Sequence, residues 1–151
     1  VKEEGSLTPR MAALNAGDSI FVSAPYGTFT DDESPAWWIA TGTGIAPFYS
    51  MFRSGLGSHK TLVHGVRFLH QFYFGEELQK GLGNRYIRCC STEEADGVFH
   101  GRLTAFLEQQ ESFPVNTRYF LCGNPLMVVE ARDILIARGV PWSDIVAEIY
   151  I

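Results

Sequence analysis

The 151-residue chain contains no apolar run that approaches membrane-spanning length, so we expect no membrane insertion. Its 12 basic residues form no dense run, and with 17 acidic residues the formal net charge is −5, which argues against nucleic-acid binding. The three cysteines include no Cys-x-x-Cys pair, so neither a metal site nor a disulfide framework is expected. A reducing cytoplasm is the simplest expected compartment.

The overall composition is that of a globular protein. Hydrophobic residues make up 46% of the chain and charged residues 19%, which is typical of a folded domain with a real core. The first residue is a valine, so we expect a fragment or a processed product.

From residue 36 onward, short apolar runs alternate with segments compatible with helices. The runs are nearly continuous in apolar residues, which is typical of strands buried on both faces. We expect strands at 37–41, 61–66, 86–91, 119–122 and 145–150, and helices at 46–55, 71–82, 103–110 and 125–138. The alternation predicts an α/β fold with a five-stranded, parallel, doubly wound sheet. In such a sheet ligands bind at the carboxyl ends of the strands.

Residues 1–35 follow a different pattern. Thr8 and Pro9 are typical of a helix cap and first turn, and residues 19–24 are typical of a strand. A short helix and one strand cannot bury themselves, so this piece is expected to be the end of another domain. The acidic cluster at 31–35 is expected to be a linker.

The first expected strand ends in a glycine-rich turn. Gly42 and Gly44 stand one residue apart, and Pro47 falls in the expected first turn of the helix that follows. A strand that turns on glycines into a helix directs free N–H groups and the positive end of the helix dipole at one point, where a phosphate can bind. The alternative is an ordinary glycine turn.

Other strand ends carry residues suited to a nucleotide. Arg67 follows the second strand, and its guanidinium can grip a phosphate; Arg102 begins a later helix, with a solvated arginine as the alternative. Cys122 ends the fourth strand, where it is either a site residue or a small core residue. Glu148 and Tyr150, two apart on the last strand, point to the same side, and the alternative for them is an edge-strand surface. His64, inside the second strand, is expected to be a core histidine.

Taken together in order, these motifs resemble those of the ferredoxin–NADP reductase family in its bacterial form, and the resemblance covers nearly the whole chain. The matching pieces are Ala-Thr-Gly-Thr-Gly-Ile-Ala-Pro at 40–47, His-Gly-Val-Arg at 64–67, Gly-Arg-Leu at 101–103, Leu-Cys-Gly-Asn-Pro at 121–125 and Ala-Glu-Ile-Tyr at 147–150. The Gly-Ser-Leu-Thr-Pro-Arg at 5–10 and Ala-Gly-Asp at 16–18 look like the end of the family's antiparallel FAD-binding barrel. The resemblance therefore implies two domains, the end of that barrel with its linker at 1–35 and an NAD(P)-binding domain at 36–151.

The resemblance also implies a role for each site residue. Thr8 would hold the FAD pyrophosphate, and Tyr150 would cover the flavin ring. Glu148 would stabilise the charge that develops on the nicotinamide during hydride transfer. The nicotinamide nucleotide would be bound by Thr41, Gly42, Thr43 and Gly44 at its pyrophosphate, by Arg67 and Arg102 at its adenosine end, and by Cys122 and Gly123, with Asn124 and Pro125 after them, at the nicotinamide.

Two departures from the family accompany the resemblance. NADP-using members usually place Ser–Arg where this chain has Ser91 and Thr92; the loss of an arginine–phosphate contact should weaken the preference for NADPH. The choice between NADP(H) and NAD(H) therefore stays open. The family's flavin-contacting Arg-x-Tyr-Ser motif and most of its barrel are also missing from these residues.

The leading hypothesis is an FAD-dependent NAD(P)H oxidoreductase that passes electrons to ferredoxin or flavodoxin. One alternative is a nucleotide-binding module without redox activity. Another is an NADH-fed reductase of an oxygenase or cytochrome system, whose iron–sulfur cluster would be elsewhere because these residues lack the cysteine set for one. The sequence predicts neither the oligomeric state nor the direction of electron flow.

Overall fold

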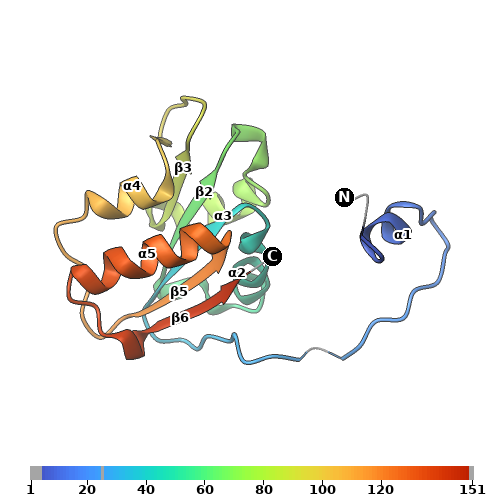
Figure 1. Ribbon diagram of the computed structural model, residues 1–151, viewed down its shortest axis with the longest axis horizontal. Helices are drawn as coiled ribbons and strands as arrows, with labels where there is room; N and C mark the ends of the chain where they lie inside the picture. The colour runs from blue at the N-terminus through green and yellow to red at the C-terminus, as the bar shows by residue number, and fades with distance from the viewer. Residues whose placement is uncertain (1–4, 25, 150–151) are drawn as a thin grey trace.

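The computed structural model describes residues 5–24 and 26–149, which form a layered α/β body and an N-terminal extension (Figure 1). Short 3₁₀ turns lie at Gly42–Gly44, Leu56–His59, Leu69–Gln71, Gly83–Arg85 and Trp142–Asp144. The helices and strands are α1 (Thr8–Ala12), β1 (Ala36–Thr41), α2 (Ile45–Arg53), β2 (Lys60–Val66), α3 (Gly75–Leu82), β3 (Tyr86–Cys90), β4 (Phe99–His100), α4 (Leu103–Glu108), β5 (Arg118–Gly123), α5 (Pro125–Ala137) and β6 (Ile145–Ile149). No helix in this described part of the chain is long and apolar enough to cross a membrane.

The strands form one sheet in the order β4-β3-β2-β1-β5-β6, and every neighbouring pair is parallel. The chain builds outward from β1 through β2 and β3 to one edge, then returns to place β5 and β6 on the other side of β1. The order of the strands therefore reverses between β1 and β5. At such a switch point the two loops that follow the strands diverge and leave room for a ligand.

Two helical layers cover the two faces of the sheet (Figure 1). On one face, Ile39 and Val63 pack with residues of α4 and α5 such as Leu107 and Leu135. On the other face, Trp38 packs with residues of α2 and α3, in the group Ala36, Trp38, Ala40, Ile45, Phe48, Leu62, Leu78, Leu82, Tyr86, Phe120 and Cys122. Because successive residues of a strand point to opposite faces, the nearly continuous apolar runs supply both cores at once.

The predicted parallel, doubly wound sheet is confirmed, but it has six strands where the sequence predicts five. The additional strand is β4, which has only two residues and pairs with Cys89 and Cys90 at the edge of the sheet. A run of two residues has no detectable alternation. Its place is set by tertiary pairing, which includes a hydrogen bond from the Gly101 N–H to the Cys90 carbonyl at 2.8 Å.

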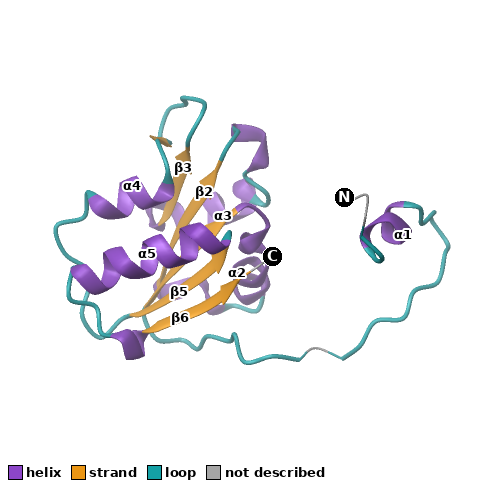
Figure 2. Cartoon of the chain, in the orientation of Figure 1, coloured by secondary structure: helices purple, strands orange, loops and turns teal. Residues whose placement is uncertain are grey.

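The N-terminal extension contains α1 and no strand among its described residues (Figure 2). The strand expected at 19–24 is wrong, because none of these residues belongs to a strand, and Phe21 is fully exposed. A strand needs a partner for its backbone groups, and this segment contacts none in the described chain. The cap expected at Thr8 is also wrong, since Leu7 precedes the helix and Thr8 is its first residue. α1 contains no buried residue.

The acidic cluster at 31–35 is bound to the α/β body by a buried lysine. The Nζ of Lys60 lies 2.8 Å from Asp31 Oδ2 and donates to the carbonyls of Asp32 and Ser34 at 2.7 and 2.5 Å. Both charged side chains of the pair are fully buried. Trp38 Nε1 donates to the same Asp31 oxygen at 2.7 Å. The entry to β1 is therefore fixed before the strand begins.

Candidate functional site

The carboxyl end of β1 turns directly into α2 through the 3₁₀ turn Gly42–Gly44. Gly42 has a φ of +54°, in the left-handed region that other residues adopt at a cost. A Cβ on Gly42 would meet no atom within 4 Å, so this turn is open above the glycine. The turn leads directly into α2, so the positive end of the α2 dipole lies beside this opening.

The end of β5 packs against this turn by close backbone contact. A Cβ on Gly44 would lie 2.3 Å from the carbonyl oxygen of Cys122, and a Cβ on Gly123 would lie 2.5 Å from Thr41 Oγ1. The Asn124 N–H donates to Thr41 Oγ1 at 3.2 Å. The Asn124 side chain caps α5 by accepting from the Leu126 N–H at 2.9 Å. The two loops at the switch point are thus held together, and this requires glycine at both contacts.

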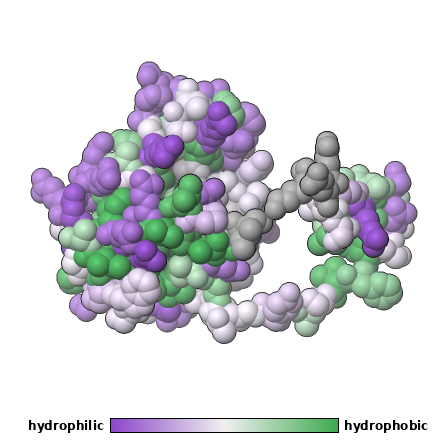
Figure 3. Space-filling model, viewed as in Figure 1, coloured by the Kyte–Doolittle hydropathy of each residue, from purple (hydrophilic) through white to green (hydrophobic). Residues whose placement is uncertain are grey.

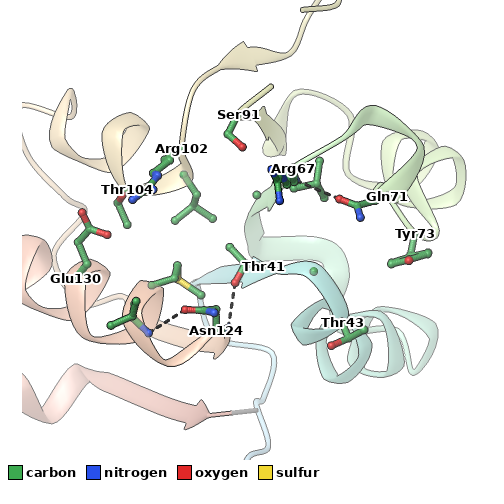
Figure 4. Close-up of a pocket in the computed structure, with 16 residues that line it drawn as sticks. Thr41, Thr43, Arg67, Gln71, Tyr73, Ser91, Arg102, Thr104, Asn124 and Glu130 are labelled. Atoms are coloured by element: carbon green, nitrogen blue, oxygen red, sulfur yellow. Dashed lines mark hydrogen bonds between the residues drawn. The ribbon is translucent and has the colours of Figure 1, made fainter. Parts of the chain in front are cut away.

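Above this junction lies a cavity of about 540 Å³ (Figure 4). It is bounded by the ends of β1, β2, β3 and β5 and by the starts of α4 and α5. Ligands of doubly wound sheets bind at this position. Its volume is typical of a site for a small molecule or cofactor. Its lining residues are Thr41, Gly42, Thr43, Gly65, Val66, Arg67, Gln71, Tyr73, Ser91, Arg102, Leu103, Thr104, Asn124, Leu126, Met127 and Glu130.

Two arginines line this cavity from neighbouring strand ends. Arg67 follows β2, and its guanidinium carbon lies 5.3 Å from the centre of the Phe68 ring. Arg102 precedes α4, and Figure 4 shows it on the opposite side from Gln71 and Tyr73. Neither guanidinium forms an ion pair in the described part of the chain. Both are therefore available to an anion.

The loops that follow β2 and β3 are bound to each other. The Thr92 hydroxyl donates to the Arg67 carbonyl, and the Glu93 carboxylate accepts from the Leu69 N–H at 2.5 Å. The Gln71 side chain accepts from the Arg67 and Phe68 N–H groups at 3.3 and 3.1 Å. This network fixes the backbone that carries Arg67, and it uses the Thr92 hydroxyl for structure.

His64 lies in the core beneath the glycine turn, as the sequence predicts. Its Nδ1 is 3.0 Å from the Tyr86 hydroxyl. Burial lowers the pKa of His64 from the ordinary 6.5 to about 4, and the backbone of Gly42 partly opposes the shift. Burial likewise raises the pKa of the Cys89 thiol to about 12. His64 is therefore a neutral structural group at physiological pH, and Cys89 remains a thiol.

The cavity brings together seven of the residues predicted for nucleotide binding: Thr41, Gly42, Thr43, Arg67, Ser91, Arg102 and Asn124. The other predicted residues do not line it. Gly44 ends the turn after β1, Gly123 ends β5, Pro125 begins α5, and Thr92 faces the Arg67 backbone. The roles assigned to all of these residues stay predictions.

The predicted nicotinamide-side residues gather on adjacent strands. Cys122 is fully buried on the α2 face of the sheet, and it pairs in register with Glu148 of β6, which is half-buried. Thr8 lies in α1, which Figure 1 shows apart from the α/β body. Tyr150 lies outside the described residues. The roles predicted for Cys122, Glu148, Thr8 and Tyr150 therefore stay predictions as well.

Several cavity residues are not predicted from the sequence. Thr104 and Glu130 lie on helices after the strand ends, and Gln71 and Tyr73 lie in the long connection between β2 and α3. None of the four stands directly at a strand end, where the rule for parallel sheets places ligands. Glu130 could have been found by helical phase, because it stands one turn and a half after the expected helix start at Pro125.

A glycine turn at the switch point of a parallel, doubly wound sheet, beneath a cavity with two unpaired arginines, defines a nucleotide-binding domain. The chain belongs to the oxidoreductase NAD-binding domain family, whose model matches residues 38–133. The predicted resemblance to ferredoxin–NADP reductases is confirmed by a relative, the flavodoxin/ferredoxin–NADP reductase of Escherichia coli K12, which is 34% identical over 85% of this chain.

Other relatives are named as reductases of monooxygenase or cytochrome P450 systems. The reductase component of propane 2-monooxygenase from Mycolicibacterium goodii is 33% identical over 87% of the chain. Among solved structures, a cytochrome P450 reductase from Amycolatopsis has a TM-score of 0.65 and 29% identity, covering 83% of this chain and 42% of its own. The chain spans 61% of the Escherichia coli relative and 43% of the Mycolicibacterium relative.

Proposed function

We propose that this chain carries the nucleotide-binding half of an FAD-dependent NAD(P)H oxidoreductase, which exchanges hydride with the nucleotide and passes electrons to ferredoxin, flavodoxin or a similar carrier. The observation that carries the proposal is the cavity, where the glycine turn, two unpaired arginines and the end of β5 meet at the switch point. Relatives named as a flavodoxin/ferredoxin–NADP reductase and a ferredoxin–NADP reductase support the electron carrier. None of the three cysteines forms a disulfide in the described part of the chain, which favours a reducing cytoplasm.

In this proposal the chain's own residues bind and orient the nucleotide. The N–H groups of Gly42 and Thr43 and the dipole of α2 bind the pyrophosphate, while Arg67 and Arg102 face the adenosine end of the nucleotide. The junction of Gly44 with Cys122 and Gly123 sets the distance from the pyrophosphate to the nicotinamide. The carboxylate of Glu148 stabilises the positive charge that develops on the nicotinamide ring, which is preorganised electrostatic stabilisation.

We assign FAD to a flavin half of which residues 1–35 are the end. The described part of these residues does not make a flavin site, because α1 buries no residue and none of them lines the cavity. The flavin, when bound, supplies the hydride acceptor. Thr8 and Tyr150 are the predicted contacts of this chain with it.

A second candidate function keeps the same chemistry with another acceptor, an oxygenase or cytochrome P450. The named relatives from Mycolicibacterium and Amycolatopsis favour it. Purified ferredoxin, flavodoxin and oxygenase components, offered in turn to the NAD(P)H-reduced protein, distinguish the two by which one is reduced fastest.

The experiment that tests the proposal is stopped-flow reduction of the flavin-loaded protein containing this chain. Glu148→Gln should lower the hydride-transfer rate by about tenfold or more, the scale expected for one preorganised electrostatic contact, with nucleotide affinity nearly unchanged. Glu111→Gln removes an exposed carboxylate between α4 and β5 and serves as the control. Nucleotide binding without flavin reduction would instead support the module without redox activity, and an effect on affinity alone would remove Glu148 from its role.

A further inference from the structure

A fully buried histidine, His64, lies beneath the glycine turn of the nucleotide cavity. It stands on β2 in register with Ala40 of β1, two residues before Gly42. Its side chain lies on the same face of the sheet as those of Leu62 and Tyr86, which is the face that α2 covers. The ring is therefore placed under the point where β1 turns into α2.

The two ring nitrogens of His64 have different surroundings. Nδ1 lies 3.0 Å from the Tyr86 hydroxyl, whereas Nε2 is buried and has no hydrogen-bond partner among the described residues. A buried nitrogen of this kind costs free energy and needs an explanation. The backbone of Gly42 acts on the ring, because it raises the pKa of His64 against the larger lowering by burial. A carbonyl that faces a ring N–H has this effect, and we assign the contact to Nε2 because Tyr86 occupies Nδ1.

The Gly42 carbonyl has room for a second donor. It accepts the Ile45 N–H within the turn, and a carbonyl oxygen has two lone pairs. In a trans peptide the carbonyl and the N–H of the next residue point in opposite directions. A donor that holds the Gly42 carbonyl from the core therefore turns the Thr43 N–H away from the core, toward the cavity that both residues line.

We propose that His64 is a positioning residue for the nucleotide pyrophosphate: its Nε2–H holds the Gly42 carbonyl and thereby directs the Thr43 N–H at the phosphate oxygens. A phosphate that accepts from the Thr43 N–H polarises the same peptide, and this strengthens the hydrogen bond between Gly42 and His64. The inference rests on the proposed nucleotide site and names a residue beneath that site which sets its geometry.

Tyr86 sets the tautomer that this role requires. A hydroxyl that donates to Nδ1 leaves the ring proton of neutral His64 on Nε2. Tyr86 keeps its own proton for this bond, since burial raises the pKa of its hydroxyl above the ordinary value of 10. The opposite tautomer would place the lone pair of Nε2 against the Gly42 carbonyl oxygen, which is repulsive.

Nuclear magnetic resonance of the unchanged, ¹⁵N-labelled 151-residue chain tests the proposal without any substitution. The couplings within the imidazole should show the proton of His64 on Nε2. Saturation with NAD⁺ or NADP⁺ should move the Thr43 amide proton and the His64 Nε2 proton downfield, because both hydrogen bonds shorten. A ring proton on Nδ1, or a Thr43 amide that the bound nucleotide does not move, overturns the proposal.

His64→Leu removes the donor, and calorimetric titration measures the resulting loss of affinity. NAD⁺ and NADP⁺ should both bind about tenfold more weakly, the factor of one lost hydrogen bond. The ratio of the two affinities should stay the same, because both nucleotides carry the same pyrophosphate. His64→Gln, whose amide can donate from the place of Nε2, should recover most of the affinity. His59→Leu makes the same change at an exposed histidine outside the cavity and should bind like the unchanged chain.

A folded His64→Leu variant with full affinity overturns the positioning role and leaves the nucleotide site standing. Equal losses in His64→Leu and His64→Gln also overturn it, since a histidine that only fills the core would give that result. Should His64→Leu fail to fold, the tautomer and the Thr43 shift in the unchanged chain decide. Failure of the unchanged chain to bind either nucleotide overturns the proposed nucleotide site, and this inference with it.

Discussion

Beneath the nucleotide cavity, single residues join loops that are far apart in the sequence. Gly44 allows the turn after β1 to lie against the Cys122 carbonyl, where a Cβ would stand 2.3 Å from the oxygen. Thr41 accepts the Asn124 N–H at the same junction. His64 lies beneath the turn, and its Nδ1 is 3.0 Å from the Tyr86 hydroxyl. Gly44 therefore serves close packing at this junction, and the buried histidine couples this packing to pH.

The depressed pKa of His64 predicts a stability that falls in mild acid. The pKa is about 4 in the folded chain and about 6.5 when unfolded, so between these values the unfolded state binds the additional proton. The free energy of unfolding should thus decrease as the pH falls below about 6.5, by about 2 kcal/mol at pH 5, and this loss should level off below about 4. Urea unfolding at a series of pH values measures this.

His64→Gln should remove that contribution, so that the difference in unfolding free energy between variant and unchanged chain shrinks as the pH falls from about 7 to about 4. His59→Gln, at an exposed histidine just before β2, is the control and should follow the unchanged chain. A His64→Gln variant whose difference from the unchanged chain does not depend on pH would show that His64 is not buried in its neutral form.

At the scale of elements, the segment that enters β1 belongs to the α/β body. Phe29 packs edge to face on Phe48 and Phe120, at ring-centre distances of 5.7 and 5.6 Å. Two residues later, Asp31 pairs with Lys60 at the start of β2. An apolar contact and a buried ion pair thus fix the approach to the two central strands. These contacts attach residues 29–31 to the α/β body, and the predicted domain boundary at residue 36 stays a prediction.

Asp31→Asn should lower the free energy of unfolding by about 3 kcal/mol, because it leaves the buried Lys60 charge without its counter-ion. Glu33→Gln, an exposed change in the same segment, should stay within about 0.5 kcal/mol of the unchanged chain. Chemical unfolding of the three proteins side by side measures both values. A loss for Asp31→Asn as small as that for Glu33→Gln would mean that the pair does not stabilise the body.

The elements that the sequence predicts correctly are those whose signals are local. The five longer strands and the helices that follow β1, β2 and β5 are predicted because apolar runs, glycine turns and proline at a first turn are visible within a few residues. β4 is missed because a two-residue strand exists only through its pairing with Cys89 and Cys90. The pairing of Asp31 with Lys60 has no local signal either, because the two residues lie far apart in the sequence.

In the candidate site, too, residues with a local sequence signal are predicted and residues placed by tertiary packing are missed. Thr41, Arg67 and Asn124 stand at strand ends, and the rule for parallel sheets is enough to place them together from the sequence alone. Glu130 is overlooked because its place in the cavity depends on how α5 is rotated against the sheet. That rotation is set by the packing of Val128, Ala131 and Leu135, not by any local signal.

At the scale of the whole molecule, the α/β body and the N-terminal extension differ in how they are stabilised. The body has two apolar layers, whereas the extension exposes Ile20, Phe21 and Val22, with Phe21 fully open to solvent. Figure 3 shows the apolar surface of the extended segment that follows α1. Exposed apolar residues in a row mark a surface that another protein segment covers, as the proposed flavin half would.

This difference predicts that two shortened chains will differ in thermal stability. Residues 29–151 keep Phe29 and the Asp31–Lys60 pair, and should unfold within about 2 °C of the unchanged chain, because the residues removed stabilise nothing in the body. Residues 36–151 lose the ring contacts and leave the Lys60 charge buried without its partner, and should unfold about 10 °C or more lower. Thermal unfolding followed by circular dichroism measures both unfolding temperatures.

Equal midpoints for the two shortened chains would contradict the stabilising role of Phe29 and Asp31. A lower unfolding temperature already present in 29–151 would show that the extension packs on the body.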